Sequence, residues 1–188
     1  MPRVVAPPST LEIANEEPPS RDWYNFFFNL YEYCRGDYDV ALGGIFALSN
    51  QEVTNSGGLA SDLVDYIFER RRLIEDGDSL GLVFRGTYAA NANNKRIVIS
   101  FGSQTIFDTG ALAINGGAWI FEATVTRTSA NTQNIFVKAF YNNVAQTAFV
   151  SGVQDLESSD IDIKLTATGV ANNDIALKEY YFNINPIG

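Results

Sequence analysis

The sequence predicts a mainly β fold: an antiparallel β-sandwich, jelly-roll-like, preceded by an extended proline-rich leader and a short N-terminal α-helix. Apolar and polar residues alternate from about residue 63 onward, as in half-buried strands. Segments rich in Asn and Gly interrupt this alternation at fairly regular spacing. We therefore divide the chain into a leader plus helix (1–35), a connector (36–62) and a β-sandwich (63–188).

The leader, residues 1–20, holds five of the six prolines. Proline fixes φ and removes a backbone donor, so this segment is expected to be extended, without a periodic face from which to build a core. We expect it to become ordered only by lying along another surface.

An aromatic helix is predicted for residues 21–34, because seven aromatic residues fall within the eleven residues 23–33. Ser20 offers an N-cap and Gly36 a C′ glycine. The polar residues recur at intervals of three or four and form one narrow stripe: Asp22, Asn25, Asn29 and Glu32. A helix this apolar needs cover from copies of itself, from a partner or from the rest of the chain.

The connector, residues 36–62, is rich in Gly, Asn and Ser and contains a short apolar island at residues 45–48. We expect it to fold over the sandwich or over a neighbouring molecule. The island alone is too short to assign to a helix or a strand.

The strands of the sandwich are predicted from apolar residues with a period of two. These runs are residues 80–84, 97–101, 119–125, 135–141, 161–165 and 175–177. Turns are predicted at residues 76–78, 91–94, 115–117, 142–143 and 172–174, which are rich in Asn, Asp and Gly. Many short strands without intervening helices favour an antiparallel sandwich.

Residues 63–74 fit two patterns. Leu63, Val64, Ile67 and Phe68 have helical spacing, and Ser61 could cap such a helix. The alternative is a strand that leads into the run at residues 80–84.

Composition excludes several classes of function. The net charge of −9 gives no electrostatic support for nucleic-acid binding. The basic cluster Arg70-Arg71-Arg72 precedes several acidic residues, so we interpret it as a solvated face or as local ion pairing. No apolar run approaches the length of about 18 residues that a membrane span needs, and the N-terminus lacks the apolar core of a signal peptide. We expect no membrane partner and a soluble protein.

Catalytic chemistry that depends on histidine is excluded, because the chain has none. The single cysteine, Cys34, forms no intrachain disulfide, and we interpret it as a small buried residue at a helix end. One cysteine without histidine also excludes a zinc site, and we expect no cofactor.

Carboxylates leave one enzymatic alternative open. Asp155, Glu157, Asp160 and Asp162 cluster in sequence, and a glycosidase needs two carboxylates that face each other across a sugar. We favour an acidic loop that enters a strand with its acids outward, and hence no enzyme. Calcium could bind this cluster, or Asp76 and Asp78, but the regular Asp-rich loop pattern is missing.

Exposed aromatic residues could bind carbohydrate. Trp119 shares a strand face with Phe121 and Val125, so we expect it in the core. Four tyrosines could lie on the surface, although tyrosine at strand ends is ordinary packing: Tyr88, Tyr141, Tyr180 and Tyr181.

Several segments together resemble a β-sandwich module of tailed-bacteriophage virion proteins. They are residues 76–80, 86–96, 101–102, 106–112, 119–127 and 163–169. In addition, the run Arg21-Asp22-Trp23-Tyr24-Asn25-Phe26-Phe27-Phe28-Asn29-Leu30-Tyr31 after a proline-rich leader resembles the anchoring segment of phage head-surface and tail-fibre proteins. The resemblance implies a homotrimer and a strand before the turn at residues 76–78.

A trimer would also meet the need of the aromatic helix for cover. Three copies bundled around one face would bury Trp23, Phe27, Leu30 and Cys34. The flanking aromatics would contact a neighbouring strand, subunit or leader: Tyr24, Phe28 and Tyr31.

The resemblance favours a non-enzymatic capsid decoration (cement) protein on the surface of the phage particle, made in the host cytoplasm. Its partners would be two further copies and the shell of the major capsid protein. The alternative is a short tail fibre or receptor-binding protein, with tail or baseplate proteins and host surface glycans as partners.

Overall fold

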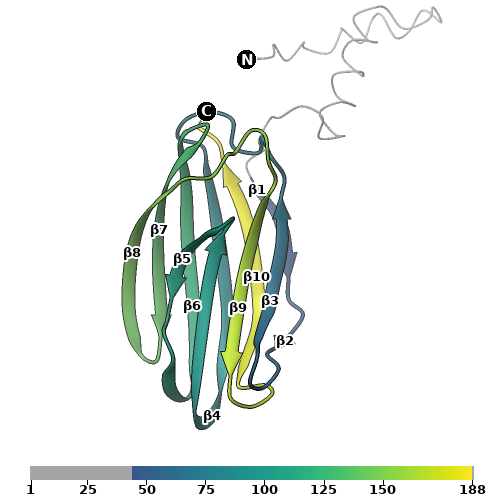
Figure 1. Ribbon diagram of the computed structural model, residues 1–188, viewed down its shortest axis with the longest axis vertical. Coiled ribbons are helices and arrows are strands. Elements are labelled where there is room, and N and C mark those ends of the chain that lie inside the picture. Colours follow the sequence, from purple (N-terminus) through teal and green to yellow (C-terminus); the bar gives the residue numbers. More distant parts are fainter. Residues whose placement is uncertain (1–43, 188) are drawn as a thin grey trace, which may run out of the picture. The chain divides into compact units, whose positions relative to one another are not determined.

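The computed structural model describes residues 44–187 of the chain (Figure 1). These residues form ten strands and, within this range, no helix. The strands are β1 (Gly44–Ser49), β2 (Val53–Thr54), β3 (Ala60–Phe68), β4 (Ser79–Phe101), β5 (Gln104–Asp108), β6 (Leu112–Ser129), β7 (Thr132–Tyr141), β8 (Val144–Gly152), β9 (Ile161–Gly169) and β10 (Ile175–Asn185). All pairings between them are antiparallel, so the mainly β prediction is confirmed.

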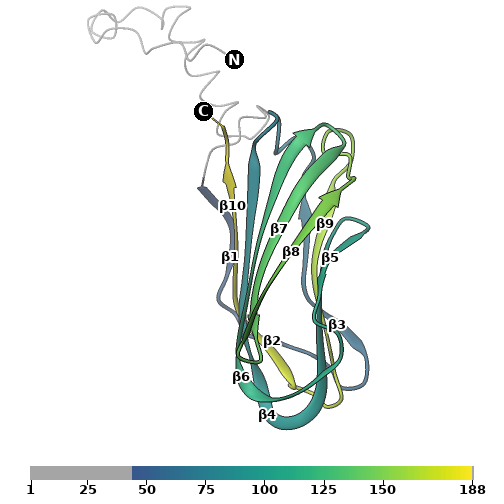
Figure 2. The ribbon, with the colours of Figure 1, turned by 90° about the vertical axis from the view of Figure 1, so that its left-hand side faces the viewer.

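The strands pair into one ten-stranded sheet that folds into two layers (Figure 2). One layer follows the order β1-β10-β4-β6-β7-β8. The other contains β3 and β9, and β9 pairs with the second half of β4, as does β5. This arrangement is compatible with a sandwich. The predicted helix at residues 21–34 lies outside the described residues.

The two layers are joined where β4 and β6 bend together, as the curve of β4 in Figure 2 shows. Residues 79–88 of β4 pair with β6 in the first layer, and residues 95–101 pair with β9 in the second. The register between β4 and β6 shifts between Ala90 and Asn94, opposite Asn115 and Ala113. The turns predicted at residues 91–94 and 115–117 do not end a strand, because both segments lie within β4 and β6, at the bend where the chain passes from one layer to the other. Asn- and Gly-rich residues here provide a β-bulge within two continuous strands.

A buried polar network fills this corner. Lys95 is 1% exposed, and its ammonium donates to the Ile114 carbonyl at 2.6 Å and to Asn91 Oδ1 at 2.8 Å. Asp174 is fully buried and accepts from Asn91 Nδ2 at 2.7 Å, from Asn93 Nδ2 at 3.1 Å and from the Ala171 amide at 2.8 Å. Because burying a charge is costly without partners, this set of contacts fixes the bulge in one conformation.

The other predicted turns are confirmed. Residues 76–78 precede β4, and residues 172–174 lie between β9 and β10. Asn142 and Asn143 have φ of 49° and 58° and join β7 to β8 as a two-residue hairpin. Positive φ at both central residues is the type I′ pattern, whose twist matches that of the flanking strands.

Strands begin well before residue 63. β1 and β2, together with the start of β3, occupy the described part of the range assigned to the connector. β1 pairs with β10, and its Phe46 packs against Phe68 of β3 and Phe182 of β10, with ring centroids 5.8 and 6.2 Å apart. Of residues 63–74, the strand that the resemblance implied extends only to Phe68, as part of β3, and residues 69–74 form neither a strand nor a helix.

The core lies between the layers and follows the predicted alternation. β7 alternates strictly between exposed and buried residues, and Trp119 of β6 is 1% exposed, as expected. Trp119 packs against Phe121 and Tyr88, with ring centroids 5.4 and 6.4 Å away. Each buried side chain of this size contributes about 1.5–3 kcal/mol, so the interior supplies the main stabilisation of the sheet.

Candidate interaction surface

The residues predicted to form the oligomer and anchor interface lie outside the described residues. They are Trp23, Tyr24, Phe27, Phe28, Leu30, Tyr31 and Cys34. Their role as an anchor stays a prediction. No helix that could cross a membrane occurs in residues 44–187.

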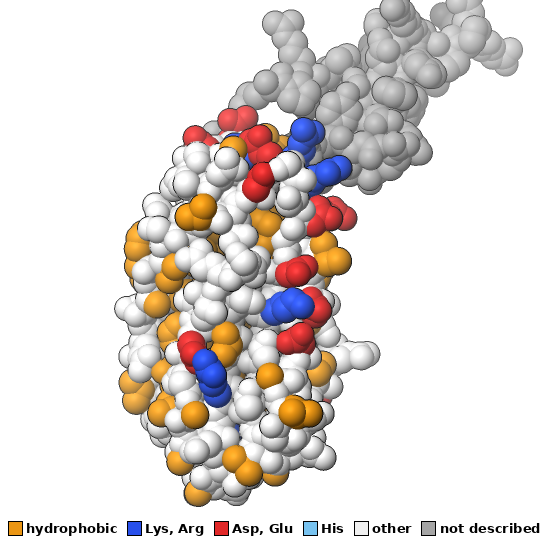
Figure 3. Space-filling model, in the orientation of Figure 1, with side chains coloured by type: hydrophobic (Ala, Val, Ile, Leu, Met, Phe, Trp, Pro, Cys, Tyr) orange, Lys and Arg blue, Asp and Glu red, His pale blue; other side chains and the backbone are white. Residues whose placement is uncertain are grey.

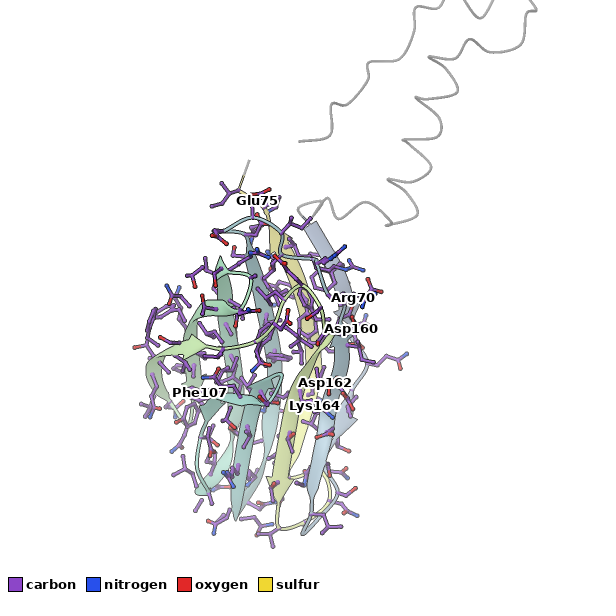
Figure 4. The ribbon with its side chains drawn as sticks, turned by 45° about the horizontal axis from the view of Figure 1, so that its top comes forward. Arg70, Glu75, Phe107, Asp160, Asp162 and Lys164 are labelled. Atoms are coloured by element: carbon purple, nitrogen blue, oxygen red, sulfur yellow. The ribbon has the colours of Figure 1, made fainter. Side chains whose placement is uncertain are left out.

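The predicted acidic cluster has separate structural contacts and is not a facing pair. Asp155 accepts hydrogen bonds from the Ser158 hydroxyl and from the amides of Ser158 and Glu157, which hold the pKa of Asp155 below its usual value. Asp160 accepts from the Arg70 amide at 2.9 Å, and Figure 4 shows Asp160 and Asp162 spread along the chain at the start of β9. The acids thus order a loop and its surroundings.

Glu157 has a different partner, since it accepts a hydrogen bond from Arg127 of β6. Arg127 is 7% exposed, and its guanidinium donates to Glu157 at 2.8 Å, to Asp76 at 3.1 Å and to the Leu73 carbonyl at 2.9 Å. Asp78 accepts from the amides of Ile74, Glu75 and Ile187. In the part of the chain that the structure describes, no group of His, Cys, Asp or Glu side chains is arranged to hold a metal ion.

The basic cluster also has local partners. Arg72 forms an ion pair with Glu69 and lies over the Phe46 ring, 5.6 Å from its centroid. The Arg70 amide is bonded to Asp160. These contacts agree with the expected ion pairing on a solvated face.

The four tyrosines proposed as surface groups divide into two pairs. Tyr88 and Tyr141 are buried, and burial raises the pKa of both phenols. The Tyr141 hydroxyl donates to Gln146 Oε1 at 2.8 Å. Tyr180 and Tyr181 are half-buried on β10, and Arg85 lies over the Tyr181 ring. Ordinary packing therefore accounts for all four.

An apolar surface that the sequence reasoning missed lies on the outer face of β6, β7 and β8. Phe136, Phe140 and Phe149 are 38%, 43% and 66% exposed. Phe136 pairs with Phe149 across β7 and β8. We call this set the outer phenylalanine surface. The signal was present in the sequence, because β7 carries aromatic residues on both of its faces.

A shallow depression of about 280 Å³ adjoins this surface. Phe140, Ile120 and Ala145 give it an apolar floor, and Ala145 lies opposite Phe140 in the ladder. Glu122, Lys138 and Thr147 supply polar groups at its border, and Gln146 also lines it.

The edge beside the depression is β8, with the sequence Val144-Ala145-Gln146-Thr147-Ala148-Phe149-Val150-Ser151-Gly152. It contains no charged residue and no proline, the two features with which proteins commonly protect an exposed edge strand. In Figure 3 the charged side chains gather over β3 and β9 and near the end that carries the C-terminus. The margin formed by β7 and β8 shows apolar and uncharged groups instead.

Comparison with known proteins identifies no family. No family model and no curated protein matches the chain. Among solved structures, it is similar to the CBM2 module of the evolved Dit of Lactobacillus casei BL23 phage J-1. The two are 14% identical with a TM-score of 0.38, over 66% of this chain and 70% of that module. A likeness this distant carries no argument about the function of the chain.

Proposed function

We propose that this chain is a non-enzymatic structural protein of a tailed-phage particle, a homotrimeric capsid decoration (cement) protein with a jelly-roll-like sandwich. The observation that supports an assembly role is the outer phenylalanine surface beside an uncharged edge strand. Exposed apolar surface of this kind is typical of sites where proteins meet one another. The phage context rests on the sequence resemblance.

In the proposed mechanism the protein acts by non-covalent binding alone and catalyses no reaction. Residues 1–35 bind the capsid shell and two further copies, and the sandwich projects from the particle. Apolar area buried at these contacts stabilises the shell by mass action, since the bound state is favoured over the open one. The outer surface of the sandwich stays available for contacts between molecules.

Copy number on purified particles tests this role. Quantitative mass spectrometry is expected to find hundreds of copies per particle, on the scale of the capsid lattice. A few copies, or a few dozen, would contradict decoration and support a fibre.

A second candidate function is recognition of host surface glycans by a tail fibre. The depression beside Phe140 favours it, because an aromatic ring stands next to Glu122 and Lys138, which could bind sugar hydroxyls. Glycan-array binding that is lost in Phe140→Ala would establish this function. Binding that Phe140→Ala retains would exclude the depression as the site.

Absence of enzymatic activity is part of the proposal. Asp155 and Glu157 serve the loop and Arg127, respectively. Hydrolysis of a host polysaccharide that disappears in Asp155→Asn or Glu157→Gln would overturn a purely structural role.

A further inference from the structure

We infer that β8 is a self-association site, at which two copies of this chain join their sheets by antiparallel pairing of β8 with β8 about a two-fold axis at Thr147. This contact goes beyond the proposed decoration role, because it joins sandwich to sandwich and does not use residues 1–35. It would link one trimer to another, and it does not require that the protein belong to a phage.

The outer edge of β8 carries hydrogen-bonding groups that no other described strand uses. Within residues 44–187, β8 pairs with β7 alone. In a type I′ hairpin the residues that flank the turn, Tyr141 and Val144, form a hydrogen-bonded pair. Since such pairs alternate along an antiparallel ladder, Ala145, Thr147 and Phe149 direct their N–H and C=O groups away from β7.

The free stretch of this edge has a defined end. The Ser151 carbonyl, next in the series, accepts a hydrogen bond from Gln104 Nε2 at 3.0 Å. The hairpin at Asn142 and Asn143 closes the opposite end. Three residues centred on Thr147 therefore remain to pair with another strand.

Self-pairing centred on Thr147 is complementary in size. It places Ala145 opposite the second copy's Phe149, Phe149 opposite the second copy's Ala145, and Thr147 opposite itself. About six ladder hydrogen bonds form, two for each of the three pairs. A large ring beside a methyl group is a favourable cross-strand arrangement. Centring the pair on Ala145 or Phe149 shortens the overlap and loses this match.

The depression receives the side chain that this register supplies. Ala145 forms part of its floor, and Phe140 stands next to Ala145 on β7. The second copy's Phe149, opposite Ala145 on the same face, reaches Phe140 across the small alanine. Rings that are exposed in the single chain thus cover one another, which removes apolar surface from water.

Charge permits this contact in a chain with a net charge of −9. β8 itself carries no charge, so no like charges meet in the new ladder. The nearest cation is Lys138 of β7. It lies opposite Thr147 of β8 on one side and opposite Glu122 of β6 on the other. The two copies of Lys138 would be three strand spacings apart, about 14 Å, where salt screens their repulsion.

Sedimentation velocity of the full-length chain tests the contact. Thr147→Glu sets two carboxylates against each other on the axis, and it is expected to halve the mass of the assembly at a fixed concentration. Thr124→Glu is the matched control, since Thr124 is exposed on the same face of β6 but away from the edge. An unchanged mass for Thr147→Glu, or an equal loss in both variants, would overturn the proposal.

Cross-linking provides a second measurement that does not depend on disrupting the edge. In a Cys34→Ser background, Thr147→Cys is expected to form a covalent dimer with a short thiol-reactive cross-linker, because this residue faces its own copy. Thr124→Cys is expected to stay monomeric on a denaturing gel. Equal cross-linking of the two variants, or none at Thr147→Cys, would contradict the two-fold register. These results do not depend on copy number per particle, so failure of this contact and failure of the decoration role can be told apart.

Discussion

Close packing around Trp119 governs the interior at the scale of single residues. Its indole Nε1 is buried and has no hydrogen-bond partner among residues 44–187. An unpaired buried donor is costly, so the ring must be held by shape and by contact with its neighbours. Gly86, its partner in the ladder between β4 and β6, leaves the space that the indole occupies.

Gly86→Ala is therefore expected to lower the free energy of unfolding by about 3 kcal/mol. A Cβ at this position would overlap the Trp119 ring and the Ala176 carbonyl, which cannot both move away in a packed core. Urea denaturation followed by tryptophan fluorescence measures the loss. Gly58→Ala is the control, because Gly58 has a φ of +76° and open space around it, so only backbone strain of about 1–2 kcal/mol is expected. Equal losses in the two variants would show that the indole has room to move.

The surroundings of two arginines predict different effects for the same substitution. Arg127→Met leaves the buried Leu73 carbonyl without its donor and removes the cation that Glu157 and Asp76 both contact. The expected loss in the free energy of unfolding is about 3 kcal/mol. Arg96→Met breaks an ion pair with Asp108 that is open to solvent, so a much smaller loss than in Arg127→Met is expected. Urea denaturation of both variants at low and moderate salt checks the ranking. A larger loss in Arg96→Met would contradict it.

At the scale of elements, the bend shared by β4 and β6 shows that one turn-like composition is compatible with two different backbone structures. Residues 91–94 and 115–117 have the composition of turns, and composition alone does not distinguish a tight turn between two strands from a bulged bend within one strand. The two segments lie opposite each other in one ladder, and this relation exists only once the strands are paired. Asn91 and Lys95 lie four residues apart on β4, but Asp174 and Ile114 are distant in the chain, so the network that joins them could not be predicted from spacing.

Asp174 makes this corner sensitive to acid. Burial opposes its ionisation, but hydrogen bonds from Ala171, Asn91 and Asn93, with the charge of Lys95, bring its pKa below the usual value. A carboxyl group with a lowered folded pKa stabilises the fold above its unfolded pKa of about 4. That contribution is lost as pH falls from about 5 through the folded pKa.

Asp174→Asn is expected to destabilise the protein by about 2–4 kcal/mol at pH 7, because an amide nitrogen would face the Ala171 or Asn93 donor. It also removes the negative charge that offsets burial of the Lys95 ammonium. The variant should lose less additional stability than the parent between pH 6 and pH 3, since Asp174 no longer titrates. Urea denaturation across this range measures both effects, and an identical acid loss in parent and variant would rule out Asp174 as its source.

At the scale of the whole molecule, alternation in the sequence predicted the core and the antiparallel pairing, because burial between two layers imposes a period of two. It did not predict the outer phenylalanine surface. The pattern was interpreted as one apolar face per strand, so Phe136 and Phe140 were overlooked beside Ile135 and Val137. A surface that contacts another molecule is apolar although it is exposed, so alternation between one apolar and one polar face does not reveal it. Apolar residues on both faces of a strand indicate such a surface.

The division of labour between residues 1–35 and the sandwich leads to a last prediction. Residues 44–187 contain ten paired strands around one hydrophobic core, so a chain that lacks residues 1–35 is expected to unfold within about 2 °C of the full-length midpoint. The same deletion is expected to abolish incorporation into particles, since the proposed shell contact is gone. Differential scanning calorimetry and immunoblots of purified particles measure the two effects separately. Incorporation of the truncated chain at the full-length level would place the particle contact in the sandwich, and β8 with its outer phenylalanine surface would then be the first place to look for it.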